Sequence, residues 1–306
     1  MRILVTGAAG LIGGDAVRAL VGAGNEVVAV TKRSGSTDTG LRTSISLDLR
    51  SPAAIALLVA QRPALIVHAA AVLPAAFEGD QAASAARDNR AMDDVVVAAA
   101  ASMGCQLVYI SSTSLYGCVQ TICSEDSPVS PRGPYGQEKY RSERTILALE
   151  IRRVILRVSA PYGSRQRSST VIRKFVHRAL RGEDLFYHGT GAREQDFTAV
   201  EDISAAIVAA TMATGTGIFN IASGKPISMK ELAHLVVRSV GPRVSRVLPS
   251  GTDDPEEQCR ARIGIARAER ELQWNPVVDL ATGVQRMGSA FEHHVSDPSA
   301  DAPKRQ

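Results

Sequence analysis

The glycine pattern at the start of the chain constrains the fold more than any other feature of the sequence. Residues 6–13 read T-G-A-A-G-L-I-G and follow an apolar run, RILV, that predicts a buried strand over residues 2–6. A helical pattern begins at Leu11, so the glycines lie in a strand-to-helix turn. There the first glycine permits a tight bend, the second lets the backbone approach a pyrophosphate, and the third allows close helix packing. We therefore expect a dinucleotide at the helix N-terminus, contacted by Gly7, Gly10, Leu11, Ile12 and Gly13.

Short apolar runs alternate with helical patterns through the first half of the chain. The patterns predict further strands over residues 26–31, 44–48, 64–68, 106–111 and 154–158, and helices over residues 11–23, 52–61, 84–101 and 135–149. Strands separated by helices at this spacing imply right-handed crossovers and a parallel sheet covered on both faces. The expected fold class is α/β, a Rossmann-type doubly wound parallel sheet, with a dinucleotide-binding domain over residues 1–163.

The chain changes character after residue 163. Basic and polar segments such as SRQRSST, a helix near residues 171–181, and short elements broken by glycine and proline follow. They predict a smaller C-terminal substrate-binding lobe over residues 164–292, some segments of which return to the main sheet. Residues 293–306 are polar with two prolines and predict a tail.

Composition excludes several classes of protein. The longest apolar run, residues 53–60, is far too short for a membrane-spanning helix, and the N-terminus lacks the features of a signal peptide, so we expect a cytoplasmic protein. A net charge of +4 over 306 residues, without basic stripes interleaved with aromatics, favours a small-molecule partner over nucleic acid. The histidines show no metal-site spacing, and we expect no metal. We expect free thiols at the four cysteines, which fit no C-x-x-C spacing: Cys105, Cys118, Cys123 and Cys259.

The end of the second predicted strand bears on the choice of cofactor. An acidic residue there would bond the ribose 2′-hydroxyl of NAD, whereas a basic side chain accommodates the 2′-phosphate of NADP. The chain has Thr31, Lys32 and Arg33 at this point. They favour NADP(H) over NAD(H), which stays an alternative. In the other interpretation, Lys32 and Arg33 are solvated loop residues that contact no cofactor.

A second motif carries chemistry. Tyr135 and Lys139 form Y-x-x-x-K in a predicted helix, and residues four apart lie on one helix face. An adjacent ammonium favours the phenolate over the phenol. Ser111–Ser114, SSTS, follows a buried strand, which places a hydroxyl at the carboxyl edge of the sheet. A hydroxyl, a phenol and an amine can move a proton on or off an alcohol while hydride passes to or from a nicotinamide.

Together these motifs resemble the short-chain dehydrogenase/reductase superfamily, specifically its extended branch of NAD(P)-dependent sugar epimerases, dehydratases and ketoreductases. The resemblance reaches to about Met287 and includes HAAA at 68–71, RVSAPYG at 157–163, QDFTAVEDI at 195–203, IFNIASG at 218–224 and LQWNP at 272–276. It implies catalytic roles for Ser112, Tyr135 and Lys139. It implies that Tyr135 and Lys139 also contact the cofactor. It adds these further residues to the cofactor site: Asp48, Leu49, Ala69, Ala70, Ala71, Asn89 and Pro161.

Departures from the family pattern narrow the expected reaction. Thr113 and Ser114 follow Ser112 where family 4,6-dehydratases carry Asp-Glu, so no carboxylic acid is available there to expel water. Family reductases that also epimerise carry a cysteine where this chain has Ser114. We therefore expect an NADP(H)-dependent ketoreductase that acts on a keto-sugar, nucleotide-linked, or on a related carbonyl intermediate. The alternatives are an NAD-dependent nucleotide-sugar 4-epimerase and a non-catalytic cofactor sensor on the same fold.

The substrate end of the site departs from the family as well. Family members that act on nucleotide sugars hold the diphosphate with an Asn and an Arg, and this chain has Ser159 and Gln195 at those positions. A displaced phosphate grip would come from nearby arginines. We expect substrate contacts from Thr113, Ser114, Ser159, Arg165 and Arg193. The resemblance also implies a homodimer through the helices at 84–101 and 135–149.

Overall fold

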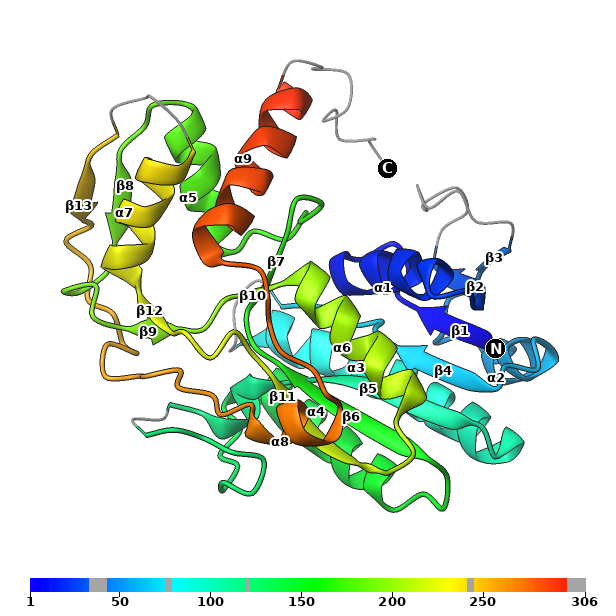
Figure 1. The fold of residues 1–306 in the computed structure, drawn as a ribbon. Coiled ribbons are helices and arrows are strands. Elements are labelled where there is room, and N and C mark those ends of the chain that lie inside the picture. The colour runs from blue at the N-terminus through cyan, green and yellow to red at the C-terminus, as the bar shows by residue number, and fades with distance from the viewer. Residues whose placement is uncertain (33–42, 75–78, 119–120, 241–244, 296–306) are drawn as a thin grey trace.

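A seven-stranded parallel sheet lies at the centre of the molecule (Figure 1). The computed structural model describes residues 1–32, 43–74, 79–118, 121–240 and 245–295, and the strand count refers to these residues. The strands are β1 (Arg2–Thr6), β2 (Glu26–Thr31), β3 (Ser44–Ser46), β4 (Leu65–His68), β5 (Gln106–Ser112), β6 (Arg153–Val158) and β11 (Gly217–Ile221). Their order is β11-β6-β5-β4-β1-β2-β3, which confirms the predicted doubly wound fold. The direction of winding reverses between β1 and β4, where such sheets open a crevice at their carboxyl ends.

Helices cover both faces of this sheet, and the side chains of each strand alternate between the two faces. In β1, Ile3 and Val5 belong to one buried cluster, whereas Leu4 belongs to the other. The first face is covered by α1 (Leu11–Gly22), α6 (Val200–Met212) and α8 (Ala266–Glu271). The second is covered by α2 (Ala54–Ala60), α3 (Asp80–Met103) and α4 (Gly133–Leu147). Burial on both faces explains why the strands read as continuous apolar runs.

The predicted elements occur, with their ends displaced by a few residues. The helix predicted over residues 84–101 begins at Asp80 and ends at Met103, where Gly104 adopts a left-handed conformation at φ 61° and stops it. The serine segment leaves β5 in a short 3₁₀ turn, η1 (Thr113–Tyr116).

A second group of elements packs around a core of its own, at the upper left of Figure 1. It contains α5 (Val171–Leu180), α7 (Met229–Ser239), α9 (Leu280–Val295), β8 (Leu185–Tyr187) and β13 (Val247–Pro249). Four two-residue strands join it to the sheet region: β7 (Pro161–Tyr162), β9 (Glu194–Gln195), β10 (Thr198–Ala199) and β12 (Ile227–Ser228). Between them the chain returns to the sheet through α6 and β11, which pairs with β6.

The domain limits at residues 163 and 292 stay a prediction, with one correction at the C-terminus. Helix α9 continues to Val295, so the helix includes the first three residues of the segment predicted as a tail. Residues 296–306 lie outside the described part of the chain.

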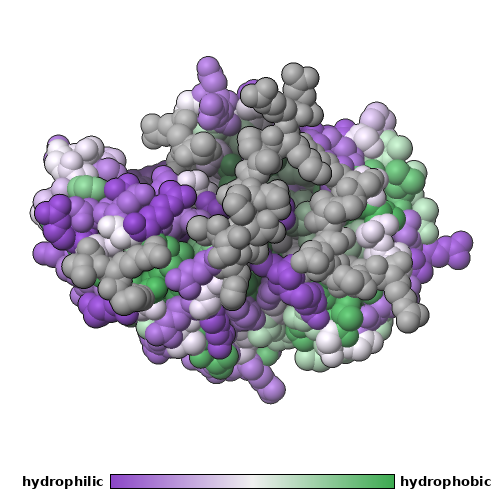
Figure 2. All heavy atoms as spheres, turned by 90° about the horizontal axis from the view of Figure 1, so that it is seen from above, coloured by the Kyte–Doolittle hydropathy of each residue, from purple (hydrophilic) through white to green (hydrophobic). Residues whose placement is uncertain are grey.

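The surface is mixed in character. On the face shown in Figure 2, hydrophobic residues form patches separated by hydrophilic ones. Of the helices that the structure describes, none combines the length and the apolar character needed to cross a membrane.

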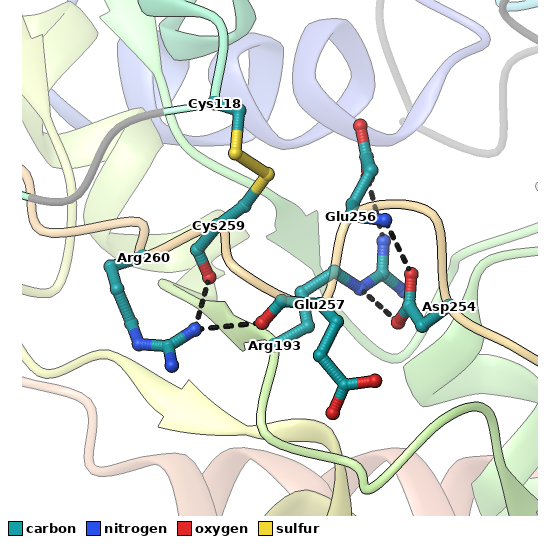
Figure 3. Close-up of a disulfide and its surroundings, with 7 residues drawn as sticks. All are labelled: Cys118, Arg193, Asp254, Glu256, Glu257, Cys259 and Arg260. Atoms are coloured by element: carbon teal, nitrogen blue, oxygen red, sulfur yellow. Dashed lines mark hydrogen bonds and ion pairs between the residues drawn. A yellow bond between two sulfur atoms is a disulfide. The ribbon is translucent and has the colours of Figure 1, made fainter.

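Two of the four cysteines form a disulfide, which corrects the expectation of four free thiols. Cys118 follows η1, and Cys259 lies in the segment between β13 and α8 (Figure 3). The two are 141 residues apart in sequence, yet the fold brings their Cα atoms to 4.8 Å, within the span of a disulfide. No short-range spacing could indicate this pair. Cys105 and Cys123 are buried free thiols, as expected.

Candidate functional site

Two glycines at the start of the chain, Gly7 and Gly13, have no room for a side chain. Gly7 has a φ of 67°, and a Cβ there would lie 2.7 Å from the carbonyl oxygen of Ala69. A Cβ on Gly13 would lie 2.2 Å from the carbonyl oxygen of Gly7, so α1 packs directly on the turn. Helix α1, all of which is described, begins at Leu11 and has no acidic residue in its first turn. Such a close backbone cradle at a helix N-terminus fits a dinucleotide pyrophosphate.

The end of β2 carries one described cation beside a carboxylate. Lys32 has an exposed side chain, and its Nζ lies 3.4 Å from Oδ2 of Asp48. Arg50 donates hydrogen bonds to both carboxylate oxygens of Asp48, and these bonds are the main reason that the pKa of Asp48 is lowered. Thr31 is buried, and Arg33 lies outside the described residues.

The segment after β4 borders the glycine turn. Ala69 and Ala70 are half-buried and Ala71 is exposed, and the Ala70 N–H donates to Oγ1 of Thr6 over 3.2 Å. The buried amide of Asn89 accepts from the N–H of Val72 over 2.7 Å and donates to its carbonyl oxygen over 3.0 Å. Asn89 is thus engaged with this segment's backbone. Leu49, also predicted at the cofactor site, is buried in the core beneath α2 and α3.

The elements that carry the three predicted catalytic residues, α4 and the end of β5 with η1, pack against one another. Tyr135 and Lys139 are both buried on α4. The ammonium of Lys139 donates to the carbonyl oxygen of Ile110 over 3.0 Å, two residues before Ser112. Ser112 caps η1, which packs against α4, and its Oγ donates to Oγ of Ser114 over 2.8 Å. The Tyr135 hydroxyl has no hydrogen-bond partner among the described residues.

Burial controls the protonation of this pair. It is the main cause that raises the pKa of Tyr135, and the charge of Asp93 raises it further. Burial also lowers the pKa of Lys139, although the charges of Asp93, Glu143 and Glu138 oppose this. With no ligand bound, Tyr135 therefore carries its proton at neutral pH, as a proton donor must.

Sequence reasoning missed the buried carboxylate beside these residues. Asp93 on α3 accepts hydrogen bonds from His68 Nε2 over 2.8 Å, from the Tyr109 hydroxyl over 2.7 Å and from the Ser142 hydroxyl over 2.6 Å. Burial alone would raise the pKa of Asp93, but the charge of Lys139 and these hydrogen bonds outweigh it and lower the pKa. The available signal was helical spacing, because Asp93 follows Asn89 by four residues.

Residues 3–222 match the model of the NAD dependent epimerase/dehydratase family. The chain belongs to this family. It is accordingly an extended short-chain dehydrogenase/reductase, and members of this group are NAD-dependent enzymes.

Named proteins resemble the chain along almost its whole length. UDP-glucose 4-epimerase of Mycolicibacterium smegmatis is 28% identical, covering 96% of this chain and 99% of the relative. dTDP-glucose 4,6-dehydratase of Streptomyces griseus is 28% identical, covering 96% of this chain and 95% of the relative. The solved structure of MoeE5 in complex with UDP-glucuronic acid and NAD superimposes with a TM-score of 0.83 at 28% identity, over 96% of this chain and all of that one.

Two residues from the family's later motifs hold the elements of the site together. Arg157 in β6 donates to Glu143 of α4 over 2.7 Å and to the Tyr116 hydroxyl over 3.0 Å. Tyr116 in turn donates to Asn220 of β11 over 2.7 Å, and Glu143 accepts from Ser111 over 2.6 Å. This buried network fixes α4, η1 and β6 against one another below Ser112.

The predicted substrate residues divide into two sets. Thr113 and Ser114 follow Ser112 in η1, and Ser114 is exposed. These hydroxyls stand where family 4,6-dehydratases have carboxylic acids, as the sequence indicates. Arg165 is exposed on the loop between β7 and α5, and the half-buried Pro161, predicted at the cofactor site, begins β7.

Ser159 and Arg193 are engaged within the protein. The buried Ser159 hydroxyl donates to the carbonyl oxygen of Asp196 over 2.8 Å. Arg193 forms ion pairs with Asp254 at 3.0 Å and with Glu256 at 2.9 Å, close to the disulfide (Figure 3). The predicted phosphate grip from Arg193 stays a prediction, and these two carboxylates compete with a phosphate for its guanidinium.

Proposed function

We propose that this family member is an NADP(H)-dependent reductase that converts the ketone of a nucleotide-linked keto-sugar to an alcohol. The observation that carries the proposal is the packing of α4, on which Tyr135 and Lys139 are buried, against η1, with Lys139 bonded to the Ile110 carbonyl oxygen two residues before Ser112. A phenol held protonated by burial, next to an anchored ammonium and a serine hydroxyl, is suited to protonate a carbonyl oxygen as it accepts a hydride.

Each of the three side chains has one task in this mechanism. The Ser112 hydroxyl donates a hydrogen bond to the ketone oxygen and orients it. The Tyr135 hydroxyl transfers its proton to that oxygen, which becomes the alcohol. The Lys139 ammonium stabilises the phenolate that remains on Tyr135. A bound dihydronicotinamide supplies the hydride.

The residues present fit a dinucleotide, and two features support the phosphorylated form. The cradle formed by Gly7 and Gly13 suits the pyrophosphate. No acid ends β2, where Thr31 stands, and Lys32 follows it with an exposed side chain, although Asp48 at 3.4 Å competes with a phosphate for its ammonium. A lysine there pairs with a ribose 2′-phosphate, whereas an acid would repel it.

The names of the relatives support a nucleotide-linked sugar. The two curated relatives are named for UDP-glucose and dTDP-glucose, and MoeE5 was solved with UDP-glucuronic acid. The serine and threonine hydroxyls of η1 suit a sugar better than an apolar ketone, because hydroxyls can exchange hydrogen bonds with the sugar ring.

Substitution of Tyr135 tests the proposal. In Tyr135→Phe, NADPH consumption with UDP- and dTDP-linked 4-keto-sugars should fall about 10²–10⁴-fold, because the proton donor is lost. NADPH affinity should change little. Tyr140→Phe, one turn further along the same helix, is the matched control and should keep wild-type turnover. Retained turnover in Tyr135→Phe would refute the assignment.

A 4-epimerase is the second candidate, favoured by the likeness to the UDP-glucose 4-epimerase of Mycolicibacterium smegmatis. An epimerase keeps its oxidised cofactor through both half-reactions. It would be purified with a bound dinucleotide and would interconvert UDP-glucose and its C4 epimer without added cofactor. A protein purified free of dinucleotide that consumes added NADPH stoichiometrically identifies the reductase.

A further inference from the structure

We propose that Asp93 is a positioning residue for the reaction: through the hydroxyl of Tyr109 it holds the ammonium of Lys139 in place and keeps it charged. Lys139 donates to the Tyr109 hydroxyl over 2.9 Å, and that hydroxyl donates to Asp93 over 2.7 Å. The phenol thus stands between a cation and an anion, and its dipole is aligned with both. This inference rests on the proposed function only in one respect, that the Lys139 ammonium stabilises the phenolate of Tyr135.

The hydrogen bonds of this network lead toward Asp93, apart from the one that Lys139 donates to the carbonyl oxygen of Ile110. The Ala70 N–H donates to Thr6, whose hydroxyl lies 2.6 Å from Nδ1 of His68. With that hydroxyl as donor, Nδ1 of His68 accepts, and Nε2 donates to Asp93. Ser142 adds one further donor. Asp93 is therefore the common acceptor of a buried chain that begins beside the glycine turn and ends at Lys139.

Asp93 differs from the two other carboxylates whose charges act on Lys139. Glu143 is paired with Arg157 at 2.7 Å, and Glu138 is paired with two arginines on the protein surface. Among the described residues, Asp93 has no arginine partner and is 1% exposed. A buried carboxylate in this position needs a counter-charge. His68 lies against it at 2.8 Å, and Lys139, two hydrogen bonds away, supplies a positive charge.

The direct effect falls on the titration of Lys139. Burial lowers its pKa, and Asp93 is the strongest of the charges that oppose the lowering. Removing the carboxylate therefore moves the deprotonation of Lys139 to lower pH. The titratable groups around Lys139 and Asp93 come from four elements. They are Asp93 of α3, Tyr109 of β5, His68 of β4, and Tyr135, Glu138 and Glu143 of α4.

The test is an NMR titration of the full-length protein labelled with ¹³C at the lysine ε-carbons, without substrate or cofactor. The Lys139 signal is assigned by its loss in Lys139→Met. In Asp93→Asn its midpoint should fall by about one to two pH units, the effect of removing one buried charge at this distance. Asp94→Asn, the adjacent and exposed aspartate, is the matched control and should leave the midpoint unchanged.

Tyr109→Phe separates the phenol from the carboxylate and serves if Asp93→Asn does not fold. It keeps the charge of Asp93 but removes an acceptor from the buried ammonium, so the midpoint should fall by less than in Asp93→Asn. An unchanged midpoint in Asp93→Asn would overturn the role of the carboxylate, and an unchanged midpoint in Tyr109→Phe would overturn the role of the bridge.

A second measurement links the titration to catalysis. In Asp93→Asn the alkaline limb of the kcat/KM profile should move to lower pH, because the charge of Asp93 raises the pKa of both Tyr135 and Lys139. Mere loss of folded protein lowers activity at every pH equally. A limb that stays in place while the NMR midpoint moves would overturn the catalytic meaning of the network. Failure of the proposed function is read separately, from Tyr135→Phe.

Discussion

At the scale of the residue, four charged side chains near the candidate site are buried. Lys139, Asp93, Arg157 and Glu143 are all at most 3% exposed, and each is hydrogen-bonded. Their charges balance in two pairs, one bridged by a phenol and one in direct contact. Buried charges are tolerated only with such partners, and removing one member leaves the other unpaired.

Cofactor choice is a residue-scale property of Lys32. In Lys32→Glu the affinity for NADPH should fall about tenfold, since one charged contact to a phosphate is worth roughly 1.5–3 kcal/mol and this side chain is exposed. The affinity for NADH should change far less, because NADH lacks the 2′-phosphate. Fluorescence titration with both cofactors measures this.

The control for this substitution is Lys174→Glu, which makes the same charge change on the exposed side of α5. It should leave both affinities as they are. Equal losses for NADPH and NADH in Lys32→Glu would contradict the proposed 2′-phosphate contact.

At the scale of the element, the packing of α1 on the turn that follows β1 requires glycine at residue 13. In Gly13→Ala the new Cβ would lie 2.2 Å from the Gly7 carbonyl oxygen, so the helix must move away from the turn. We expect a loss of about 1–3 kcal/mol in the free energy of unfolding and a lower affinity for the dinucleotide. Urea denaturation and cofactor titration measure the two effects.

Gly22→Ala is the matched control in the same helix. A Cβ on Gly22 has nothing within 4 Å, so alanine should be neutral or should stabilise α1 by up to about 1 kcal/mol. If Gly13→Ala behaved like Gly22→Ala, the close packing of α1 on the glycine turn would be wrong.

At the scale of the whole molecule, the disulfide ties the segment after Ser112 and η1 to the segment that follows β13. Cys118 lies two residues after Tyr116, whereas Cys259 belongs to the loop whose acids hold Arg193 (Figure 3). Because the bond closes a long loop, reduction should lower the free energy of unfolding by about 2–4 kcal/mol. Urea denaturation of the protein with and without dithiothreitol measures this.

Single cysteine variants give the controls for the disulfide. Cys118→Ser should unfold identically with and without the reductant, since the bond cannot form. Cys123→Ser, which removes a buried free thiol nearby, should keep the wild-type dependence on the reductant. A wild-type protein indifferent to the reductant would show that the bond does not stabilise the fold.

The local features of the site were readable from the sequence because their physics is local. A turn that needs φ above zero at Gly7 requires glycine, and the four-residue spacing of Tyr135 and Lys139 puts both on one helix face wherever the helix packs. The alternation of apolar runs with helical patterns likewise implied the parallel sheet. Each of these signals spans only a few residues, so each can be interpreted without knowledge of the fold.

The packing of distant elements decided the rest. Asp93 is connected to Lys139 through the Tyr109 hydroxyl only because α3 and α4 lie on the same face of the sheet, with Tyr109 of β5 beneath them. Arg193 is held by acids some sixty residues further along the chain, and the disulfide joins residues 141 apart. The sequence by itself determined the glycine turn, the shared helix face of Tyr135 and Lys139, and the class of fold. Which charges those residues face is a long-range property, and only the tertiary structure determined it.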